Sequence, residues 1–124
     1  MKSILSLNDG NLVYRTIGKR HAETIFFCHS LGANQSLWDR QIEQLSDSYH
    51  IVSCDLRGHG ESDIFTTPYS IEIFARDILT LLDHLDIFSF HFVGLSLGSM
   101  IGLWLSSNSS NRVKRLVLAG ASAK

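Results

Sequence analysis

The sequence of 124 residues predicts an α/β fold built on a mainly parallel sheet. Two observations lead to this prediction. Continuous apolar runs, typical of strands covered on both faces, alternate along the chain with segments that carry apolar residues at helical spacing. The connections between them are short, which favours strand–helix–strand units with helices on both faces of the sheet. The length fits one unit, residues 1–124.

The first half of the chain predicts a hairpin followed by a strand–helix–strand unit. SILSL and LVYRTIG lie on either side of the turn residues NDGN, and TIFFCHS reads as a buried parallel strand. Residues 36–46 place apolar side chains at helical spacing, and IVSCD returns to a short strand. The apolar positions of this helix are Leu37, Trp38, Ile42 and Leu45.

A second strand–helix–strand pattern fills the other half. A helix is expected from Ser70, a residue typical of helix N-caps, and FSFHFVG follows as a strand. A mostly apolar helix is then expected from Leu97 to about Ser107, and VKRLVLAG is the sixth strand. The apolar face of the helix after Ser70 consists of Ile71, Phe74, Ile78, Leu81, Leu82 and Leu85.

Composition excludes several classes of protein. Eleven basic and twelve acidic residues give a net charge of -1 without a long run of one sign, so no nucleic-acid partner is expected. Neither a signal-peptide core nor a membrane-spanning run is present, which favours a cytoplasmic protein without a membrane partner. Cys28 and Cys54 lie in apolar segments and are expected to be buried free thiols. No feature calls for a metal or an organic cofactor, and the oligomeric state is not predicted.

The stretch GLSLG, residues 94–98, matches the G-x-S-x-G pattern of a nucleophile elbow between a predicted strand and a predicted helix. In such an elbow Ser96 is the nucleophile, and Gly94 and Gly98 remove side chains that would collide where helix and strand approach. The hydroxyl is then held at the C-terminal edge of the sheet, where open α/β folds bind ligands. The alternative is a glycine-flanked serine in an ordinary strand-to-helix turn.

The stretch HSLGANQSLWD, residues 29–39, starts at the end of a predicted strand and contains a glycine loop. Such a loop can direct a backbone N–H toward a developing oxyanion. The candidate donors of an oxyanion hole are the N–H groups of Leu31 and Leu97. His29 is interpreted as a structural histidine that orients its own turn.

The stretch CDLRGHGESD, residues 54–63, is interpreted as scaffolding. Asp55 and Arg57 are expected to pair locally, while Gly58 and Gly60 permit a tight turn. His59 is an alternative candidate for a general base, but its spacing does not place it within reach of Ser96. The other histidines are interpreted as surface or cap residues: His21, His50, His84 and His91.

With HSLG, DLRGHGES and GLSLG in this order, the chain resembles the α/β-hydrolase superfamily, and most closely the 3-oxoadipate enol-lactonases of aromatic-compound degradation. The resemblance implies an α/β-hydrolase fold and hydrolysis of a small carboxylic ester or lactone by a serine nucleophile with a histidine base and an acidic residue. Two alternatives stay open, namely a general carboxylesterase of the same fold and a non-catalytic fragment or binding module.

The resemblance also implies that the chain is the N-terminal half of such an enzyme, truncated after strand six. In the family the acid and the histidine follow a cap segment and later strands. No histidine follows Ser96 here, and residues 121–124 contain no carboxylate. A serine hydroxyl without a base is a poor nucleophile, so impaired turnover is expected of the 124-residue chain.

Overall fold

The computed structural model describes residues 2–120 and has six strands and four helical segments in this part of the chain. Residues 121–124, in which the sequence offers no carboxylate, lie outside the described part. The elements are, in chain order, β1 Lys2–Leu7, β2 Gly10–Gly18, β3 Thr24–Cys28, the 3₁₀ helix η1 Gln35–Trp38, α1 Asp39–Leu45, β4 His50–Cys54, α2 Ile71–His84, β5 Phe90–Leu95, α3 Leu97–Asn108 and β6 Val113–Ala119.

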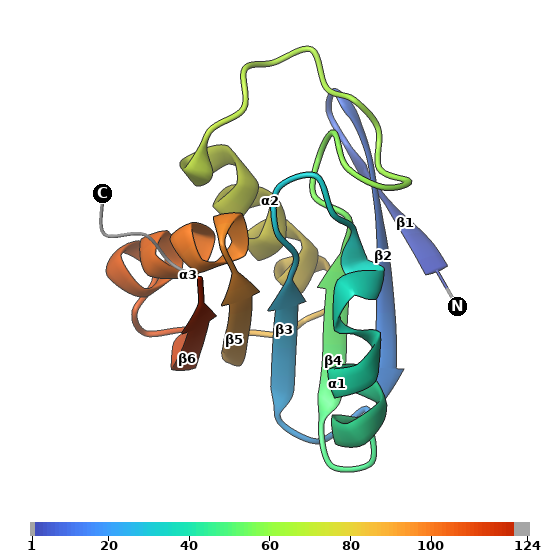
Figure 1. Cartoon of the computed structure of the whole chain (residues 1–124), viewed down its shortest axis with the longest axis vertical. Helices are drawn as coiled ribbons and strands as arrows, with labels where there is room; N and C mark the ends of the chain where they lie inside the picture. Colours follow the sequence, from blue (N-terminus) through green and yellow to red (C-terminus); the bar gives the residue numbers. More distant parts are fainter. Residues whose placement is uncertain (1, 121–124) are drawn as a thin grey trace.

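The strands form one sheet in the order β1-β2-β4-β3-β5-β6 (Figure 1). The hairpin β1–β2 is antiparallel and joins the sheet by antiparallel pairing of β2 with β4. From β4 onward the neighbouring strands are parallel. The predicted hairpin and the mainly parallel sheet are confirmed, and β5, which leads to Ser96, lies between β3 and β6.

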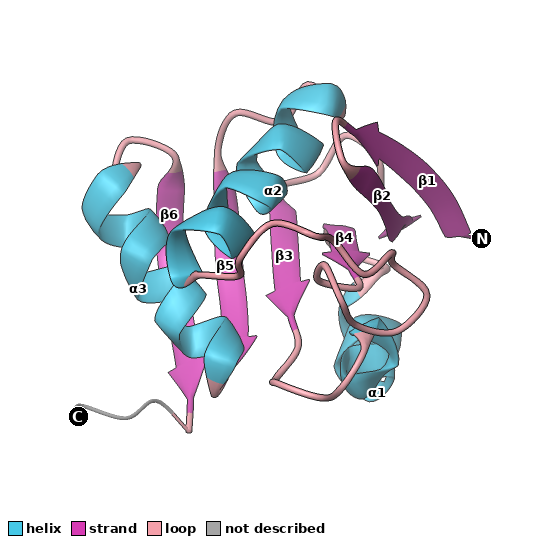
Figure 2. Cartoon of the chain, turned by 90° about the horizontal axis from the view of Figure 1, so that it is seen from above, coloured by secondary structure: helices cyan, strands magenta, loops and turns pink. Residues whose placement is uncertain are grey.

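The sheet is covered on both faces, as the sequence predicts, and β3 shows why. Along this strand alternate side chains point to opposite faces. Ile25 and Phe27 pack with Ile42 of α1 in a small apolar cluster. Phe26 and Cys28 belong to the main core, to which α2 and α3 contribute on the opposite face, where the two helices lie side by side (Figure 2). A strand buried on both sides is expected to be rich in apolar residues, as residues 25–28, IFFC, are.

Helix α2 follows the sequence prediction closely. The side chain of Ser70 accepts a hydrogen bond from the N–H of Ile73 at 3.1 Å, which satisfies one of the unpaired donors of the first turn. Phe74, Ile78 and Leu81 are buried on the face that the spacing predicts. The cap and the apolar stripe together explain where this helix begins and which face it buries.

The helix predicted over 36–46 is present but begins as a 3₁₀ helix. The prediction that Leu37 lies on its apolar face is wrong. Leu37 is exposed because it belongs to the tighter 3₁₀ turn and not to the face that Ile42 buries. Asn34 caps the 3₁₀ turn through its side chain, and the indole Nε1 of Trp38 donates to the carbonyl of Cys28 at 3.0 Å.

Two cysteines and one histidine are also largely buried. Cys28 and Cys54 are buried and free, as predicted, and burial raises the pKa of both thiols. The interpretation of His91 as a surface or cap residue is wrong. Its side chain is only 14% exposed, its Nε2 donates to Glu23 at 3.0 Å, and its ring packs against the edge of Tyr49.

Within the described part of the chain, no helix is both long and apolar enough to cross a membrane.

Candidate active site

Ser96 occupies the sharp turn between β5 and α3. Its backbone has φ 55° and ψ -110°, a left-handed conformation that a residue with a Cβ adopts only under strain. The residue is exposed, in contrast to the buried glycines at 94 and 98. Because Ser96 directly follows the end of β5, which pairs in parallel with β3 and β6, it lies at the C-terminal edge of the sheet.

The two glycines of GLSLG lie where backbone approaches backbone. A Cβ on Gly94 would lie 2.5 Å from the carbonyl carbon of Gly98, and a Cβ on Gly98 would lie 2.6 Å from the carbonyl oxygen of Cys28. Real Cβ atoms do not approach other atoms so closely. The first turn of α3 therefore lies directly against the ends of both β5 and β3.

The N–H groups of Leu31 and Leu97 are the two predicted donors to an oxyanion. Leu97 is the first residue of α3, and its N–H points out of the N-terminus of the helix. Leu31 lies in the loop that leaves β3, three residues after Cys28, and the residue is 74% exposed. Among residues 2–120, neither N–H donates a hydrogen bond to a protein acceptor. Both are therefore available to a ligand.

His29 joins the loop after β3 to the loop after β4. It is fully buried, and its Nε2 accepts a hydrogen bond from the N–H of Leu56 at 3.0 Å. Since an N–H only donates, the ring proton sits on Nδ1, which donates to the carbonyl of Ser30 at 2.8 Å. Burial lowers the pKa of His29, although the bond to Ser30 acts in the opposite direction. These contacts agree with a structural role for His29.

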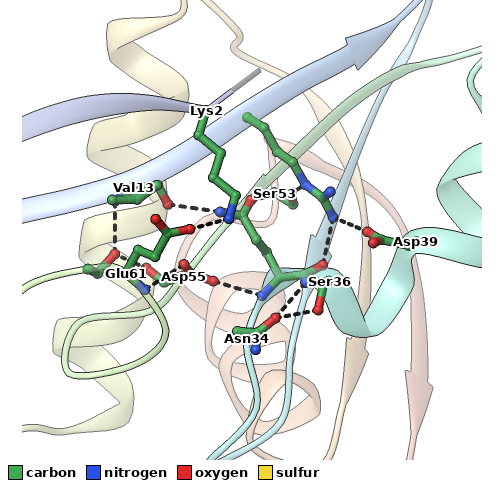
Figure 3. A network of polar contacts seen from close by, with 11 residues as sticks. Lys2, Val13, Asn34, Ser36, Asp39, Ser53, Asp55 and Glu61 are labelled. Atoms are coloured by element: carbon green, nitrogen blue, oxygen red, sulfur yellow. Dashed lines mark hydrogen bonds and ion pairs between the residues drawn. The ribbon is translucent and has the colours of Figure 1, made fainter.

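Asp55 holds the same two loops together through backbone N–H groups. Its carboxylate accepts from the N–H of Gln35 at 2.8 Å and from the N–H of Glu61 at 2.9 Å. Gln35 is itself buried, and its side-chain oxygen accepts from Ser53 of β4 at 2.8 Å. Arg15 of β2 adds a bond to the carbonyl of Gln35 at 2.7 Å. Figure 3 shows this network, which holds the segment between Leu31 and α1 against the sheet.

The prediction that Asp55 and Arg57 pair with each other is wrong. The guanidinium of Arg57 instead forms a bidentate ion pair with Asp77 of α2, at 2.7 and 2.8 Å, and lies 4.1 Å from the ring centre of Phe65. Asp55 is already satisfied by the two N–H groups, so the guanidinium turns to the carboxylate on the helix. Burial raises the pKa of Asp77 in spite of the opposing charge of Arg57.

His59 does not serve Ser96 in the described part of the chain. Its Nδ1 donates to the carbonyl of Arg57 at 3.0 Å, and the centre of its ring lies 5.0 Å from that of His29 and 6.2 Å from that of Phe74. No side chain among residues 2–120 forms a hydrogen bond with the hydroxyl of Ser96. In this part of the chain the hydroxyl of Ser96 therefore has no hydrogen-bonded base.

A hollow of about 770 Å³ lies at the other edge of the sheet. It is lined by residues at the starts of β3 and β4, among them Thr24 and His50, and by the loop that precedes β5. Parallel strands place their starts and ends on opposite edges, so this hollow is remote from Ser96. Among residues 2–120, no group of three or more His, Cys, Asp or Glu side chains is arranged to hold a metal ion.

The sequence interpretation missed the residues that hold these segments in place. Gln35 and Arg15 carry no local signal, because their partners are distant in sequence. Ser99 carries a weak local signal, since it is a polar residue within the apolar segment LGSMIGLWL. It is fully buried, and its role depends on contacts with β6.

Comparisons with known proteins identify the family of this chain. Residues 23–124 match the family model described as alpha/beta hydrolase fold. The 3-oxoadipate enol-lactonase 2 of Acinetobacter baylyi is 37% identical over 123 residues, which cover 99% of this chain and 46% of that protein. The crystal structure of the enol-lactonase from Burkholderia xenovorans LB400 has a TM-score of 0.93 and 35% identity, covering 98% of this chain and 48% of that one.

A hydrolase from Pseudomonas aeruginosa PA01 is equally similar, with a TM-score of 0.93, 36% identity and coverage of 98% of this chain and 46% of that one. The chain thus spans about half the length of the relatives it matches. The family match covers most of the chain, and the two TM-scores of 0.93 show that this chain shares the fold of the matched parts of these structures. The chain belongs to the α/β-hydrolase fold family.

Proposed function

We propose that this chain carries the nucleophile and the oxyanion hole of a serine hydrolase that acts on a carboxylic ester or lactone. The observation that carries the proposal is the strained, exposed Ser96 at the C-terminal end of β5, a strand with parallel neighbours on both sides. A conformation that costs about 1–3 kcal/mol persists only where the surrounding structure enforces it, and such strain is concentrated at functional sites.

The proposed reaction begins with attack of Ser96 Oγ on the carbonyl carbon of the substrate. A bond forms between Oγ and that carbon, the carbonyl oxygen becomes an oxyanion, and the N–H groups of Leu31 and Leu97 donate to it. Collapse of the tetrahedral intermediate breaks the bond to the ester or ring oxygen and leaves an acyl-enzyme. Water then releases the acid and restores Ser96.

The hydroxyl proton of Ser96 has to leave during the attack, and no described residue is in hydrogen-bond contact to take it. We therefore propose that the general base and its acidic partner come from outside residues 2–120. By itself the 124-residue chain is expected to be acylated slowly and to turn over poorly, since a positioned base contributes about 10²–10⁴-fold.

A lactone is the proposed substrate class. The support for it is the similarity to the enol-lactonase of Acinetobacter baylyi along 99% of this chain. By the same likeness the protein would act in the degradation of aromatic compounds. A lactone differs from an open ester in one measurable respect, because its leaving oxygen stays attached to the acyl group after ring opening.

The test is acylation of the 124-residue chain followed by mass spectrometry. The chain is incubated with 4-nitrophenyl acetate or with an aryl lactone, with and without imidazole as an added base. We expect a single acyl group on Ser96, formed faster as imidazole is added. With the lactone, the mass should rise by that of the whole lactone.

The matched control uses Ser107, an exposed serine near the end of α3. Ser96→Ala should abolish the modification, whereas Ser107→Ala should leave it unchanged. Modification that persists in Ser96→Ala, or that maps to other residues, contradicts the proposed nucleophile. A clear preference for the open ester over the lactone contradicts the lactone assignment alone.

A further inference from the structure

Ser99 is a buried hydroxyl that the proposed reaction does not use. It lies in the first turn of α3, with no exposed surface. Its Oγ lies 2.7 Å from the carbonyl oxygen of Ala119 and 3.0 Å from that of Gly94. A buried hydroxyl is tolerated only where it is hydrogen-bonded, and the single proton of Ser99 is shared between these two carbonyls, of which that of Ala119 is the nearer.

The carbonyl of Ala119 at the end of β6 receives a second donor. The backbone N–H of Ser96 donates to the same oxygen at 2.9 Å. The carbonyl of Ser96 in turn accepts from the N–H groups of Ser99 and Met100, at 2.9 and 3.1 Å. Residue 96 is thus held on both sides of its Cα, and Ser99 takes part on each side.

We propose that Ser99 is a positioning residue, which fixes the strained backbone of Ser96 by fastening the turn to the C-terminal end of β6. The inference rests on the proposed role of Ser96 as nucleophile. A left-handed φ at a residue with a Cβ relaxes unless neighbouring contacts enforce it. The Ser99 hydroxyl is the side-chain contact that joins the strand before the turn, at Gly94, to β6.

The test compares Ser99→Ala with Ser106→Ala. Ser106 is a matched control, because its hydroxyl donates to Leu103 within the same helix and does not reach β6. Ser99→Cys keeps most of the side-chain volume but is a weak donor, and it serves if Ser99→Ala does not fold.

Two measurements separate positioning from stability. Amide hydrogen exchange of Ser96, compared with Leu105 inside α3, reports whether the turn alone loosens. The acylation rate of Ser96 by 4-nitrophenyl acetate, per folded molecule, reports whether the hydroxyl is still positioned. Loss of one hydrogen bond predicts that Ser99→Ala speeds exchange at Ser96 about tenfold relative to Leu105 and slows acylation several-fold. Ser99→Cys should act in the same direction, and Ser106→Ala should change neither quantity.

Failure of the positioning role of Ser99 can be distinguished from failure of the proposed nucleophile. If the wild-type chain is acylated at Ser96 while Ser99→Ala and Ser99→Cys leave the acylation rate unchanged, the positioning role is overturned and the nucleophile stands. Equal acceleration of exchange at Ser96 and Leu105 also overturns it, because that pattern describes general stabilisation of α3. If the wild-type chain is not acylated at Ser96, the proposed function fails, and the positioning role fails with it.

Discussion

The Nε2 of His29 accepts a hydrogen bond from the N–H of Leu56 at 3.0 Å, across 27 residues of sequence. This bond joins the loops that follow two adjacent parallel strands, β3 and β4. The first of these loops leads to Leu31, a proposed oxyanion donor. The position of that donor therefore depends on a neutral, buried imidazole.

Truncation of His29 is expected to destabilise the fold substantially. His29→Ala leaves a cavity and an unpaired N–H on Leu56, at a combined cost of about 3 kcal/mol. His29→Gln should cost markedly less, since its side-chain oxygen can accept from Leu56. Urea unfolding followed by tryptophan fluorescence measures both. Equal losses for Ala and Gln would show that the bond to Leu56 contributes little.

The free energy of unfolding should decrease as the pH is lowered, because His29 is neutral in the folded protein. Burial lowers its folded pKa, while the unfolded histidine has a pKa of about 6.5. Below that value the unfolded chain binds more protons, so the free energy of unfolding decreases as pH falls from about 6.5 toward the lowered folded pKa. His50, whose pKa is lowered by burial and by Arg20 and His21, contributes in the same direction.

The measurement is the free energy of unfolding in urea at several values between about pH 7 and pH 5. His29→Gln should make its pH dependence shallower without removing it, since His50 remains. An unchanged slope in this variant would show that His29 is not the group responsible.

Adding a methyl group at either glycine of the turn should be costly. Gly94→Ala and Gly98→Ala each place a Cβ against backbone atoms that cannot move independently, and a loss of about 3 kcal/mol is expected. Gly32→Ala is the control, since it has a positive φ of 77° but nothing within 4 Å of a Cβ. It should lose only about 1 kcal/mol, from backbone strain. Similar losses at all three positions in urea unfolding would argue against close packing of the turn.

Removal of the Arg57 guanidinium should be more damaging than removal of an exposed arginine on α2. The side chains of Arg57 and Asp77 are 7% and 9% exposed. Arg57→Ala leaves a buried carboxylate without its partner, and a loss of about 3–5 kcal/mol is expected. Arg76→Ala removes an exposed pair with Glu72 on the same helix and should cost about 0.5 kcal/mol or less.

A double substitution tests whether the unpaired charge is the cause. Arg57→Ala combined with Asp77→Ala should lose less than the sum of the two single changes, because neither charge is then left alone. Strict additivity in urea unfolding would contradict the ion pair as the source of the effect.

Local pattern was sufficient for the elements that carry the candidate site. The alternation of apolar runs and helical stripes predicted the hairpin, the parallel strands and α2 with its cap at Ser70. It also predicted a strand-to-helix turn at Ser96. These features depend on residues only a few positions apart, so the sequence encodes them directly.

The sequence could not predict which polar groups meet. Asp55 and Arg57 are two residues apart, yet each has a partner 20 residues away. Asp55 accepts from Gln35, and Arg57 pairs with Asp77. His91 is near the start of a strand, yet it is mostly buried against Tyr49. Propensity and periodicity describe one element at a time, whereas these contacts exist only after the sheet has formed.

The sequence by itself determined the order of the elements and the place of Ser96, because glycine at 94 and 98 and the flanking apolar runs specify a tight turn from strand to helix. Only the tertiary structure decided how that turn is held. The carbonyl of Ala119 reaches Ser96 and Ser99 because β6 pairs in parallel with β5. That pairing brings residues 20 or more positions apart into hydrogen-bond contact, and no local pattern in the chain encodes it.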